Sequence, residues 1–176
     1  MRNETRSFAR LACRRYVLSL KATNSMPQSL VKMLAHIVFS TKDRVDLITP
    51  NVEESLFSYI SGTVRNNNAR LIIGNGTANH IHLMASIGRN DVGELIGDIK
   101  RSSSSWIKRQ GSEFKKFYWQ RGYGAFSIGQ PQVPAVSRYI RDQKEHHQRT
   151  GQSYEDEFRE LCTRYEVEFD ERYCWD

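Results

Sequence analysis

Apolar residues change their spacing along this chain in a regular way. Where Val, Ile, Leu and Phe crowd together, as between residues 30 and 41, they predict a buried strand. Where apolar residues recur about every 3.6 residues, as at Leu56, Ile60 and Val64, they predict one face of a helix. The segments found in this way are strands at 30–41, 69–73, 80–87 and 117–128 and helices at 52–67, 92–109, 133–148 and 154–165.

The order of these segments predicts the fold class. A strand–helix–strand–strand–helix–strand succession is typical of the ferredoxin-like split βαβ sandwich, an α+β fold with an antiparallel sheet and helices on one face. The two helices after the fourth strand are then extra C-terminal elements, and residues 168–176 are expected to be extended. Residues 26–176 show no repeat or linker, so we predict a single domain there.

Residues 1–25 differ from the rest of the chain in charge. They contain six basic residues and one acidic residue, so they carry most of the formal net charge of +6. The remainder is nearly neutral, and its charges must be segregated if it is to bind nucleic acid. We expect residues 1–25 to be a basic, dispensable extension ahead of Met26; a DNA-contacting arm and a targeting segment are the alternatives.

The composition argues against several classes of protein. No apolar run approaches the roughly 18 residues of a membrane span, so we expect no membrane partner. Three widely spaced cysteines without a Cys-x-x-Cys pair argue against a disulfide framework and a cysteine zinc site, which favours a reducing cytoplasm. The sequence shows no phosphate-binding loop or serine triad, and the acidic run 155–157 is interpreted as solvated charge at a helix start.

A His-Ile-His sequence at 80–82 is the sharpest local signal. Alternate side chains of a strand point to the same face, so His80 and His82 project together while Ile81 points into the core. Two neutral imidazoles at this spacing can bind one metal ion. Taken alone, such a pair is more often a chance surface motif. His36, inside the first strand, is interpreted as a hydrogen-bonded sheet residue.

Tyr139 and Gln143 lie four residues apart in a predicted helix, so they share one face. A phenol with a pKa of about 10 is a weak nucleophile near neutral pH. It can attack phosphorus when a cation polarises the phosphate and the geometry is in line. The Gln143 carbonyl can add a third ligand to the two histidines, and this set gives only a weak preference among Mg²⁺, Mn²⁺ and similar ions.

Four phrases occur in a fixed order along the chain and carry a family resemblance. They resemble the single-strand DNA transposases of the one-tyrosine HUH class, which include small bacterial insertion-sequence transposases and REP-associated tyrosine transposases. The resemblance covers residues 26–176. The phrases are Val-Phe-Ser-Thr-Lys-Asp-Arg at 38–44, Asn-His-Ile-His-Leu-Met at 79–84, Trp-Gln-Arg-Gly-Tyr-Gly-Ala-Phe-Ser-Ile at 119–128 and Tyr-Ile-Arg-Asp-Gln-Lys-Glu-His-His at 139–147.

The resemblance implies a ferredoxin-like domain that works as a homodimer on single-stranded DNA with hairpins. It implies that His80, His82 and Gln143 bind a divalent metal, Mg²⁺ or Mn²⁺. Tyr139 would cut one strand and hold a 5′-phosphotyrosine, and reversal by another 3′-OH would join strands without a nucleotide cofactor. Many relatives have an acidic residue where this chain has Asn79, which supplies no charge to attract the metal. The sequence leaves open whether the site forms in cis or in trans.

Basic and aromatic residues between positions 100 and 126 are the candidates for DNA contact. Basic side chains can contact phosphates, and aromatic rings can stack on unpaired bases. A solvated helix face and packing on the sheet are the alternatives. Tyr123 is also the rival nucleophile to Tyr139, but no glutamine follows it by four residues. The candidates are Lys100, Arg101, Lys108, Arg109, Arg121, Trp119, Tyr123 and Phe126.

Two further functions stay open on this evidence. A domesticated relative that processes chromosomal repeat hairpins would keep the same chemistry, and only the DNA beside the gene distinguishes it. A noncatalytic nucleic-acid-binding module could use the same fold, although the complete set of His80, His82, Tyr139 and Gln143 argues against it.

Overall fold

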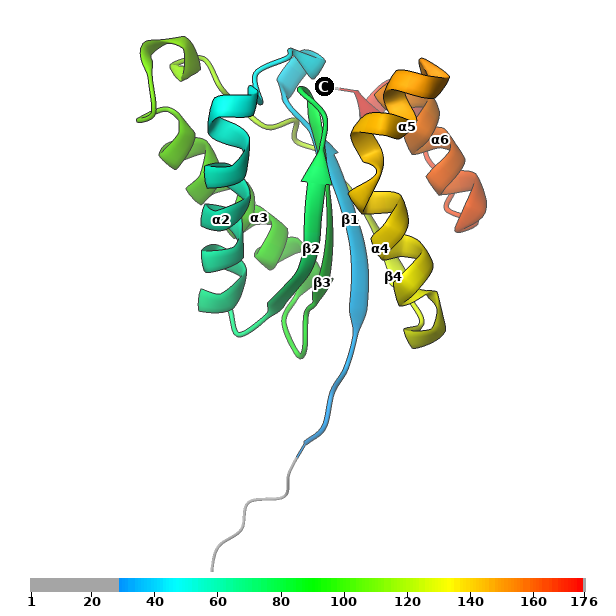
Figure 1. Ribbon diagram of the computed structural model, residues 1–176. Helices are drawn as coiled ribbons and strands as arrows, with labels where there is room; N and C mark the ends of the chain where they lie inside the picture. The colour runs from blue at the N-terminus through cyan, green and yellow to red at the C-terminus, as the bar shows by residue number, and fades with distance from the viewer. Residues whose placement is uncertain (1–28, 176) are drawn as a thin grey trace, which may run out of the picture. The chain divides into compact units, whose positions relative to one another are not determined.

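Four antiparallel strands form the sheet on which the fold is built (Figure 1). The computed structural model describes residues 29–175. The order across the sheet is β2-β3-β1-β4, so the first and third strands are central and the fourth pairs with the first. This is the sheet of the predicted ferredoxin-like sandwich. The strands are β1 (Leu34–Ser40), β2 (Arg70–Gly76), β3 (His80–Ser86) and β4 (Gly124–Ile128).

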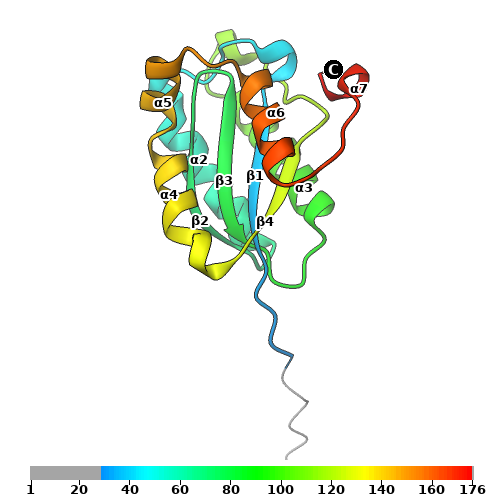
Figure 2. The same cartoon turned by 90° about the vertical axis from the view of Figure 1, so that its right-hand side faces the viewer.

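Helices cover both faces of this sheet (Figure 1 and Figure 2). On one face lie α2 (Pro50–Asn66) and α3 (Val92–Ile107), the two crossover helices of the sandwich. On the other face lie the extra C-terminal helices, which cover the side of the sheet that α2 and α3 leave exposed. These helices are α4 (Val133–Arg141), α5 (Gln143–Thr150) and α6 (Tyr154–Arg164). Shorter turns are η1 (Lys42–Arg44), η2 (Ser112–Phe114), η3 (Gln130–Gln132) and α7 (Glu171–Cys174).

Alternation along the two central strands divides side chains between the layers. Ile37 and Phe39 of β1, with Ile81 and Leu83 of β3, are fully buried in the core shared with α2 and α3. The residues between them face the C-terminal helices, where Met84 packs against Ile140 of α4. Three of the side chains on this second face are histidines, so the layer under the C-terminal helices is partly polar.

The fourth strand is shorter than predicted. The prediction began it at residue 117, but β4 begins at Gly124 and residues 117–123 form a loop apart from a single bridge. The backbone carbonyls of this loop bond to a side chain instead. The ammonium group of Lys100, on α3, donates to the carbonyl oxygens of residues 120–122 at 2.7 to 3.1 Å.

The helix predicted over 133–148 is broken near its middle. Helix α4 ends at Arg141, and Asp142 separates it from α5 with φ −93° and ψ 14°. Aspartate is a poor residue for a helix interior and readily adopts this bridge conformation. Tyr139 and Gln143 therefore sit on two consecutive helices, and the expectation of one continuous helix is wrong.

The two ends of the chain also bear on the predictions. The predicted extension, residues 1–25, lies outside the described residues. Residues 168–176 were expected to be extended, but Glu171–Cys174 form the short helix α7, whose start is capped by Asp170. Within the described part of the chain, no helix is long and apolar enough to cross a membrane.

Candidate active site

Strand β3 sets two histidines side by side. His80 and His82 alternate with Ile81, which is fully buried in the core on the other face of the sheet. Both imidazoles therefore point toward the C-terminal helices, as the period of a strand predicts. They are buried, and their ring centroids are 5.3 Å apart.

Tyr139 and Gln143 reach the same place from helices α4 and α5. The Tyr139 ring stands edge-on to the His82 ring, with the centroids 5.7 Å apart. Gln143 is the first residue of α5 and is fully buried. The structure thus brings together the four residues predicted as the nucleophile and its metal ligands. All four come from one chain.

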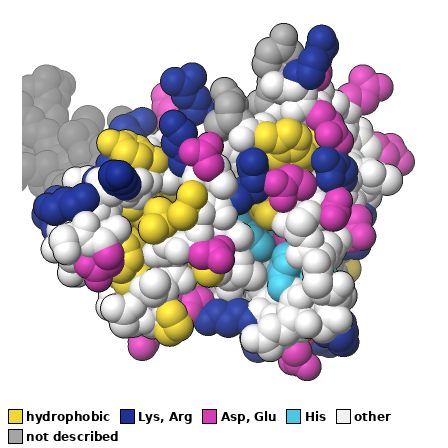
Figure 3. Space-filling view, turned by 90° about the horizontal axis from the view of Figure 1, so that it is seen from above, with side chains coloured by type: hydrophobic (Ala, Val, Ile, Leu, Met, Phe, Trp, Pro, Cys, Tyr) yellow, Lys and Arg dark blue, Asp and Glu magenta, His cyan; other side chains and the backbone are white. Residues whose placement is uncertain are grey.

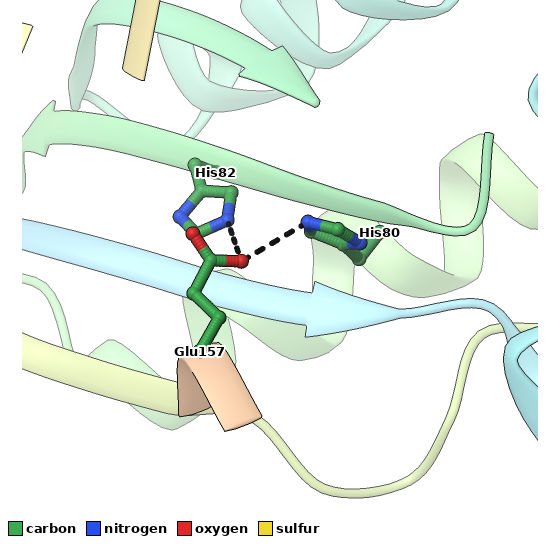
Figure 4. A group of neighbouring side chains, drawn as sticks. All are labelled: His80, His82 and Glu157. Atoms are coloured by element: carbon green, nitrogen blue, oxygen red, sulfur yellow. Dashed lines mark hydrogen bonds and ion pairs between the residues drawn. The ribbon is translucent and has the colours of Figure 1, made fainter. Parts of the chain in front are cut away.

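A fifth residue, Glu157 of α6, lies at the centre of this group (Figure 4). Its Oε2 atom is 3.2 Å from Nε2 of His80 and 3.2 Å from Nε2 of His82. Its Oε1 atom accepts hydrogen bonds from the Tyr139 hydroxyl and from Nε2 of Gln143, the latter at 2.9 Å. One carboxylate therefore contacts every member of the predicted set.

Glu157 is not among the site residues predicted from the sequence. Solvated charge, the interpretation given to the acidic run 155–157, does not describe this residue, which is only 1% exposed. A signal for the buried position was present. Glu157 follows Tyr154 by three residues and precedes Leu161 by four, and both of these are buried on the apolar face of α6. An acidic residue within an apolar helical face indicates a buried polar site.

His147 of α5 joins the group from the side. Its Nδ1 atom donates to the backbone carbonyl of Gln152 at 2.8 Å, and its Nε2 atom lies 3.1 Å from Oε2 of Glu157. The hydrogen bond with Glu157 raises the pKa of His147. The neighbouring His146 instead contacts the side chain of Gln152 at 2.9 Å. Adjacent helical positions diverge, so these two histidines do not form a second chelating pair.

Hydrogen bonds behind His80 determine which ring nitrogen faces the site. Its Nδ1 atom lies 2.8 Å from Oδ1 of Asn79 and 2.9 Å from Oγ1 of Thr77. An amide oxygen only accepts, so Nδ1 carries the hydrogen and Nε2 presents a lone pair. Burial lowers the pKa of His80 from 6.5 to about 4, so the ring is neutral at neutral pH.

Glu157 and Tyr139 differ in charge. Burial alone would raise the pKa of Glu157, but its electrostatic contact with His82 and its hydrogen bond with His147 lower that pKa below the ordinary range. Glu157 is therefore an anion at neutral pH. Burial, and then the charge of Glu157, raise the pKa of the Tyr139 phenol. The phenol is neutral in this state, and a positive charge placed beside it would favour ionisation.

The polar atoms of this group fit a metal ion. Nε2 of His80 and Oε1 of Gln143 are buried acceptors without a hydrogen-bond partner among the described residues. The lone pair of His80 faces an anionic oxygen of Glu157 at 3.2 Å, an arrangement that is repulsive unless a cation lies between them. The ligand atoms of His80, His82 and Glu157 all lie within 4.8 Å of one another. Imidazole nitrogens with amide and carboxylate oxygens suit a divalent cation.

The site approaches the surface next to Tyr139. A hollow there is lined by Arg138, Tyr139, His146 and Arg149. Figure 3 shows histidine side chains at the surface among basic and acidic ones. Of the five histidines, His146 and His147 are partly exposed and the other three are buried. Asp142 and Glu145 also line this hollow, so it carries charges of both signs.

A second hollow gathers most of the predicted DNA-contacting residues. It is lined by Lys100, Arg101, Lys108 and Arg121 together with Tyr118, which is exposed. Burial lowers the pKa of Lys100 to about 8, and its ammonium group is engaged by the carbonyls of the loop. Lys100 thus shapes the hollow, while Arg101 pairs with Asp98 and the Lys108 ammonium group lies over the Tyr118 ring. Arg109 lies outside this hollow and contacts Ser105 at 3.2 Å.

The loop that carries Arg121 is tied to the active end of the sheet. The backbone N–H of Gln120 donates to the carbonyl of Ser40 at 3.0 Å, and the Ser40 hydroxyl donates to Oε1 of Gln120 at 2.5 Å. Ser40 is the register partner of His80 across β1 and β3. The basic hollow therefore adjoins the end of the sheet that presents the histidines.

The three aromatic candidates differ in exposure. Trp119 and Phe126 are buried, 8% and 4% exposed, and the Trp119 indole donates to the Ser103 hydroxyl at 2.9 Å. Packing, the alternative interpretation, describes these two side chains. Tyr123 is 41% exposed and lies under the ammonium group of Lys100. Of the three aromatic candidates, only Tyr123 has a ring that is exposed enough to stack on an unpaired base. This role stays a prediction.

Comparisons with known proteins bear on the family and the fold of this chain. The sequence model of the family described as Transposase IS200 like matches residues 29–143. The solved structure of a REP-associated tyrosine transposase bound to a REP hairpin is similar over 69% of this chain and 72% of its own, with 14% identity and a TM-score of 0.53. A candidate transposase from Deinococcus radiodurans R1 is similar over 66% of this chain and 95% of its own, with 15% identity and a TM-score of 0.52. No curated protein matches the chain. At such identities the two structures support the fold alone.

Proposed function

Because this chain belongs to the IS200-like transposase family, we propose that it cleaves and rejoins single-stranded DNA through a covalent bond to Tyr139. One observation carries the proposal. Within a single chain, the Tyr139 hydroxyl lies at a buried cluster of acceptor atoms supplied by His80, His82 and Gln143 around one carboxylate. A nucleophile beside a set of metal ligands is what phosphoryl transfer to a protein side chain requires.

A divalent cation, Mg²⁺ or Mn²⁺, would be held by Nε2 of His80, Nε2 of His82 and Oε1 of Gln143. When bound, such an ion supplies positive charge that polarises the phosphate and favours the phenolate. The His80 ring is already arranged to bind a cation. Asn79 and Thr77 hold the His80 lone pair toward the site, and burial keeps that ring neutral.

In the cleavage step, the Tyr139 oxygen forms a bond to phosphorus while the bond from phosphorus to the 3′ oxygen breaks. The 5′ phosphate stays on the tyrosine, the phenolic proton leaves, and the departing 3′ oxygen gains a proton. One phosphodiester replaces another, so no nucleotide cofactor is needed. Attack on the phosphotyrosine by a second 3′-OH reverses the step and joins strands.

The DNA partner is a single strand that carries hairpins. Arg138 and Arg149 beside Tyr139 would receive the phosphate at the cleavage point. Arg101, Lys108 and Arg121 in the adjoining hollow would hold the flanking DNA, since phosphate contacts supply most of the affinity for nucleic acid. The similar REP-associated tyrosine transposase is bound to a hairpin, which supports this choice of substrate.

Cis assembly of the site changes what a homodimer would do. The four predicted residues lie together within one chain, which supports a site formed in cis. In the homodimer that the resemblance implies, two complete sites would act on two DNA ends. A mobile element and a domesticated relative would share this chemistry, and imperfect palindromes in the DNA beside the gene would distinguish them.

Formation of a covalent adduct tests the proposal. The protein is incubated with Mn²⁺ and single-stranded oligonucleotides tiled across the DNA that flanks the gene, and adducts are resolved on a denaturing gel. The wild type should form an adduct, and Tyr139→Phe should abolish it while noncovalent binding persists. Tyr59→Phe is the matched control, because Tyr59 stacks on Trp106 on the opposite face of the sheet.

Chelation provides the second arm of this test. EDTA should prevent the adduct, and excess Mn²⁺ should restore it. An adduct formed by Tyr139→Phe would show that the nucleophile is wrongly assigned, and Tyr123 would be examined next. An adduct that forms in EDTA would contradict the role of the cation.

A further inference from the structure

Glu157 is a carboxylate that the family match does not include. It lies on α6, beyond the matched segment 29–143, and is 1% exposed. Its side chain points toward the two histidines of β3 (Figure 4), and it also accepts a hydrogen bond from the Tyr139 hydroxyl. We propose that Glu157 is the anionic ligand of the metal site and that it also positions the Tyr139 phenol beside the cation. This inference rests on the function proposed above.

The separations between ligand atoms support the first role. Two ligands at right angles on an ion with bonds of about 2.1 Å are about 3.0 Å apart, and tetrahedral ligands are about 3.4 Å apart. Oε2 of Glu157 lies 3.2 Å from Nε2 of His80 and of His82, within this range. A plain hydrogen bond would need a proton on Nε2. His80 carries its hydrogen on Nδ1, so it has none to offer there.

Charge supports the same role. A metal-binding imidazole and the amides of Gln143 and Asn79 carry no charge, so none of them compensates a dication. A buried cation without a counter-charge is costly, and Mg²⁺ and Mn²⁺ favour carboxylate oxygens. Glu157 supplies the missing negative charge from α6.

The second oxygen of Glu157 supports the positioning role. Oε1 accepts hydrogen bonds from the Tyr139 hydroxyl and from Nε2 of Gln143. The bond from the amide nitrogen directs that group toward Glu157 and leaves Oε1 of Gln143 as the buried atom without a partner. The Glu157 carboxylate thus orients Gln143, a further proposed ligand. It also holds the Tyr139 hydroxyl beside a residue that would contact the ion.

The competing explanation is a structural counter-ion. Oε2 of Glu157 also pairs with Nε2 of His147 at 3.1 Å, a contact that joins α5 to α6. A purely structural carboxylate would matter for folding and would leave metal affinity unchanged in any variant that folds. Metal affinity and stability must therefore be measured separately.

Mn²⁺ binding to the metal-free, full-length protein without DNA makes this distinction. Calorimetric titration gives the affinity, and circular dichroism with thermal unfolding reports the fold. We expect Glu157→Gln to bind Mn²⁺ at least about tenfold more weakly than the wild type. Glu160→Gln is the matched control, because Glu160 is exposed on the same helix, and its affinity should not change. Adding Asn79→Asp to Glu157→Gln should recover part of the lost affinity.

The outcomes separate this inference from the proposed function. If the wild type does not bind Mn²⁺, the proposed metal site fails and this inference fails with it. If the wild type binds and folded Glu157→Gln binds equally well, only the role of Glu157 is overturned. Should Glu157→Gln not fold, Glu157→Asp retains the charge but withdraws it by one methylene. That variant should bind Mn²⁺ more weakly, and undiminished affinity would overturn the inference.

Discussion

Nε2 of His36 lies 2.9 Å from Nδ1 of His82, and the two rings stack with their centroids 5.1 Å apart. His36 is 1% exposed on β1, and burial lowers its pKa from 6.5 to about 3. A neutral His36 can accept the Nδ1 hydrogen of His82, which turns the Nε2 lone pair of His82 toward the metal ligands. Partners behind a ligating histidine hold its ring and tautomer in this way. The interpretation of His36 as a hydrogen-bonded sheet residue is confirmed, with a site residue as its partner.

Replacing His36, which is not itself a proposed metal ligand, should therefore weaken metal binding. We predict that His36→Phe lowers Mn²⁺ affinity by about 10- to 100-fold, because His82 loses the acceptor that orients it. His36→Gln should retain more affinity, since an amide oxygen can accept the same hydrogen. Calorimetric titration of the two variants measures the difference, and ¹⁵N spectra of the histidine rings report the tautomer. Unchanged affinity in a folded His36→Phe would contradict the positioning role.

The buried neutral histidines should make the metal-free protein sensitive to acid. The folded-state pKa values of His36 and His80, about 3 and about 4, lie below the 6.5 of an exposed histidine. Their contribution to stability is full above pH 6.5 and falls as the pH drops, because only the unfolded chain takes up protons. Between pH 6.5 and pH 5, each should cost up to about 2 kcal/mol. Urea unfolding at a series of pH values measures this slope, which His36→Phe should flatten. A stability independent of pH in this window would count against buried neutral imidazoles.

Gly76 marks a close approach in the hairpin that carries His80. A Cβ atom there would lie 2.2 Å from the carbonyl oxygen of His80 and 2.8 Å from Cα of Ile81, so the backbone would have to move. We predict that Gly76→Ala destabilises the fold by more than about 2 kcal/mol and weakens Mn²⁺ binding. Gly62→Ala is the control: open space surrounds that position on α2, and alanine there should stabilise by about 0.5 to 1 kcal/mol. Chemical denaturation compares the two, and equal stabilities would refute the steric argument.

Lys100 and Arg121 line the same hollow, but replacing Lys100 should lower stability whereas replacing Arg121 should weaken DNA binding. Lys100→Met removes the ammonium group that bonds to three loop carbonyls, and we expect it to lose about 1.5 to 3 kcal/mol of stability. Arg121→Ala should leave stability unchanged, weaken binding of a single-stranded hairpin oligonucleotide and lower the salt dependence by about one phosphate contact. Thermal unfolding and fluorescence anisotropy at several salt concentrations measure both effects. Undiminished DNA affinity in Arg121→Ala would remove this loop from the proposed interface.

Local signals account for what could be predicted of the site. Strand alternation is enough to pair His80 with His82, and a spacing of one helical turn is enough to relate Tyr139 to Gln143. Even the break at Asp142 does not separate the latter two, since both helices pack on the same face of the sheet. The apolar face of α6 indicates that Glu157 is buried, but its contact with the histidines depends on how α6 returns across the sheet to β3, a tertiary arrangement that no local pattern encodes.

The fold shows the same division between local and tertiary information. The order of strands and helices follows from apolar periodicity, and that order was sufficient for the ferredoxin-like sheet. The start of β4 was missed because Phe117 and Trp119 are buried like strand residues while they pack in a loop. Burial produces the same apolar composition with or without sheet pairing. What distinguishes this loop from a strand is its contact with Lys100, which lies about twenty residues earlier in the sequence.

Identification of the residue that carries the DNA tests the central claim most directly. The protein is reacted with Mn²⁺ and a cleavable single-stranded oligonucleotide, digested with nuclease and protease, and analysed by tandem mass spectrometry. We predict a nucleotide joined through its 5′ phosphate to the oxygen of Tyr139. A phosphate attached to any other residue, or strand cleavage with no linked nucleotide, would contradict the account.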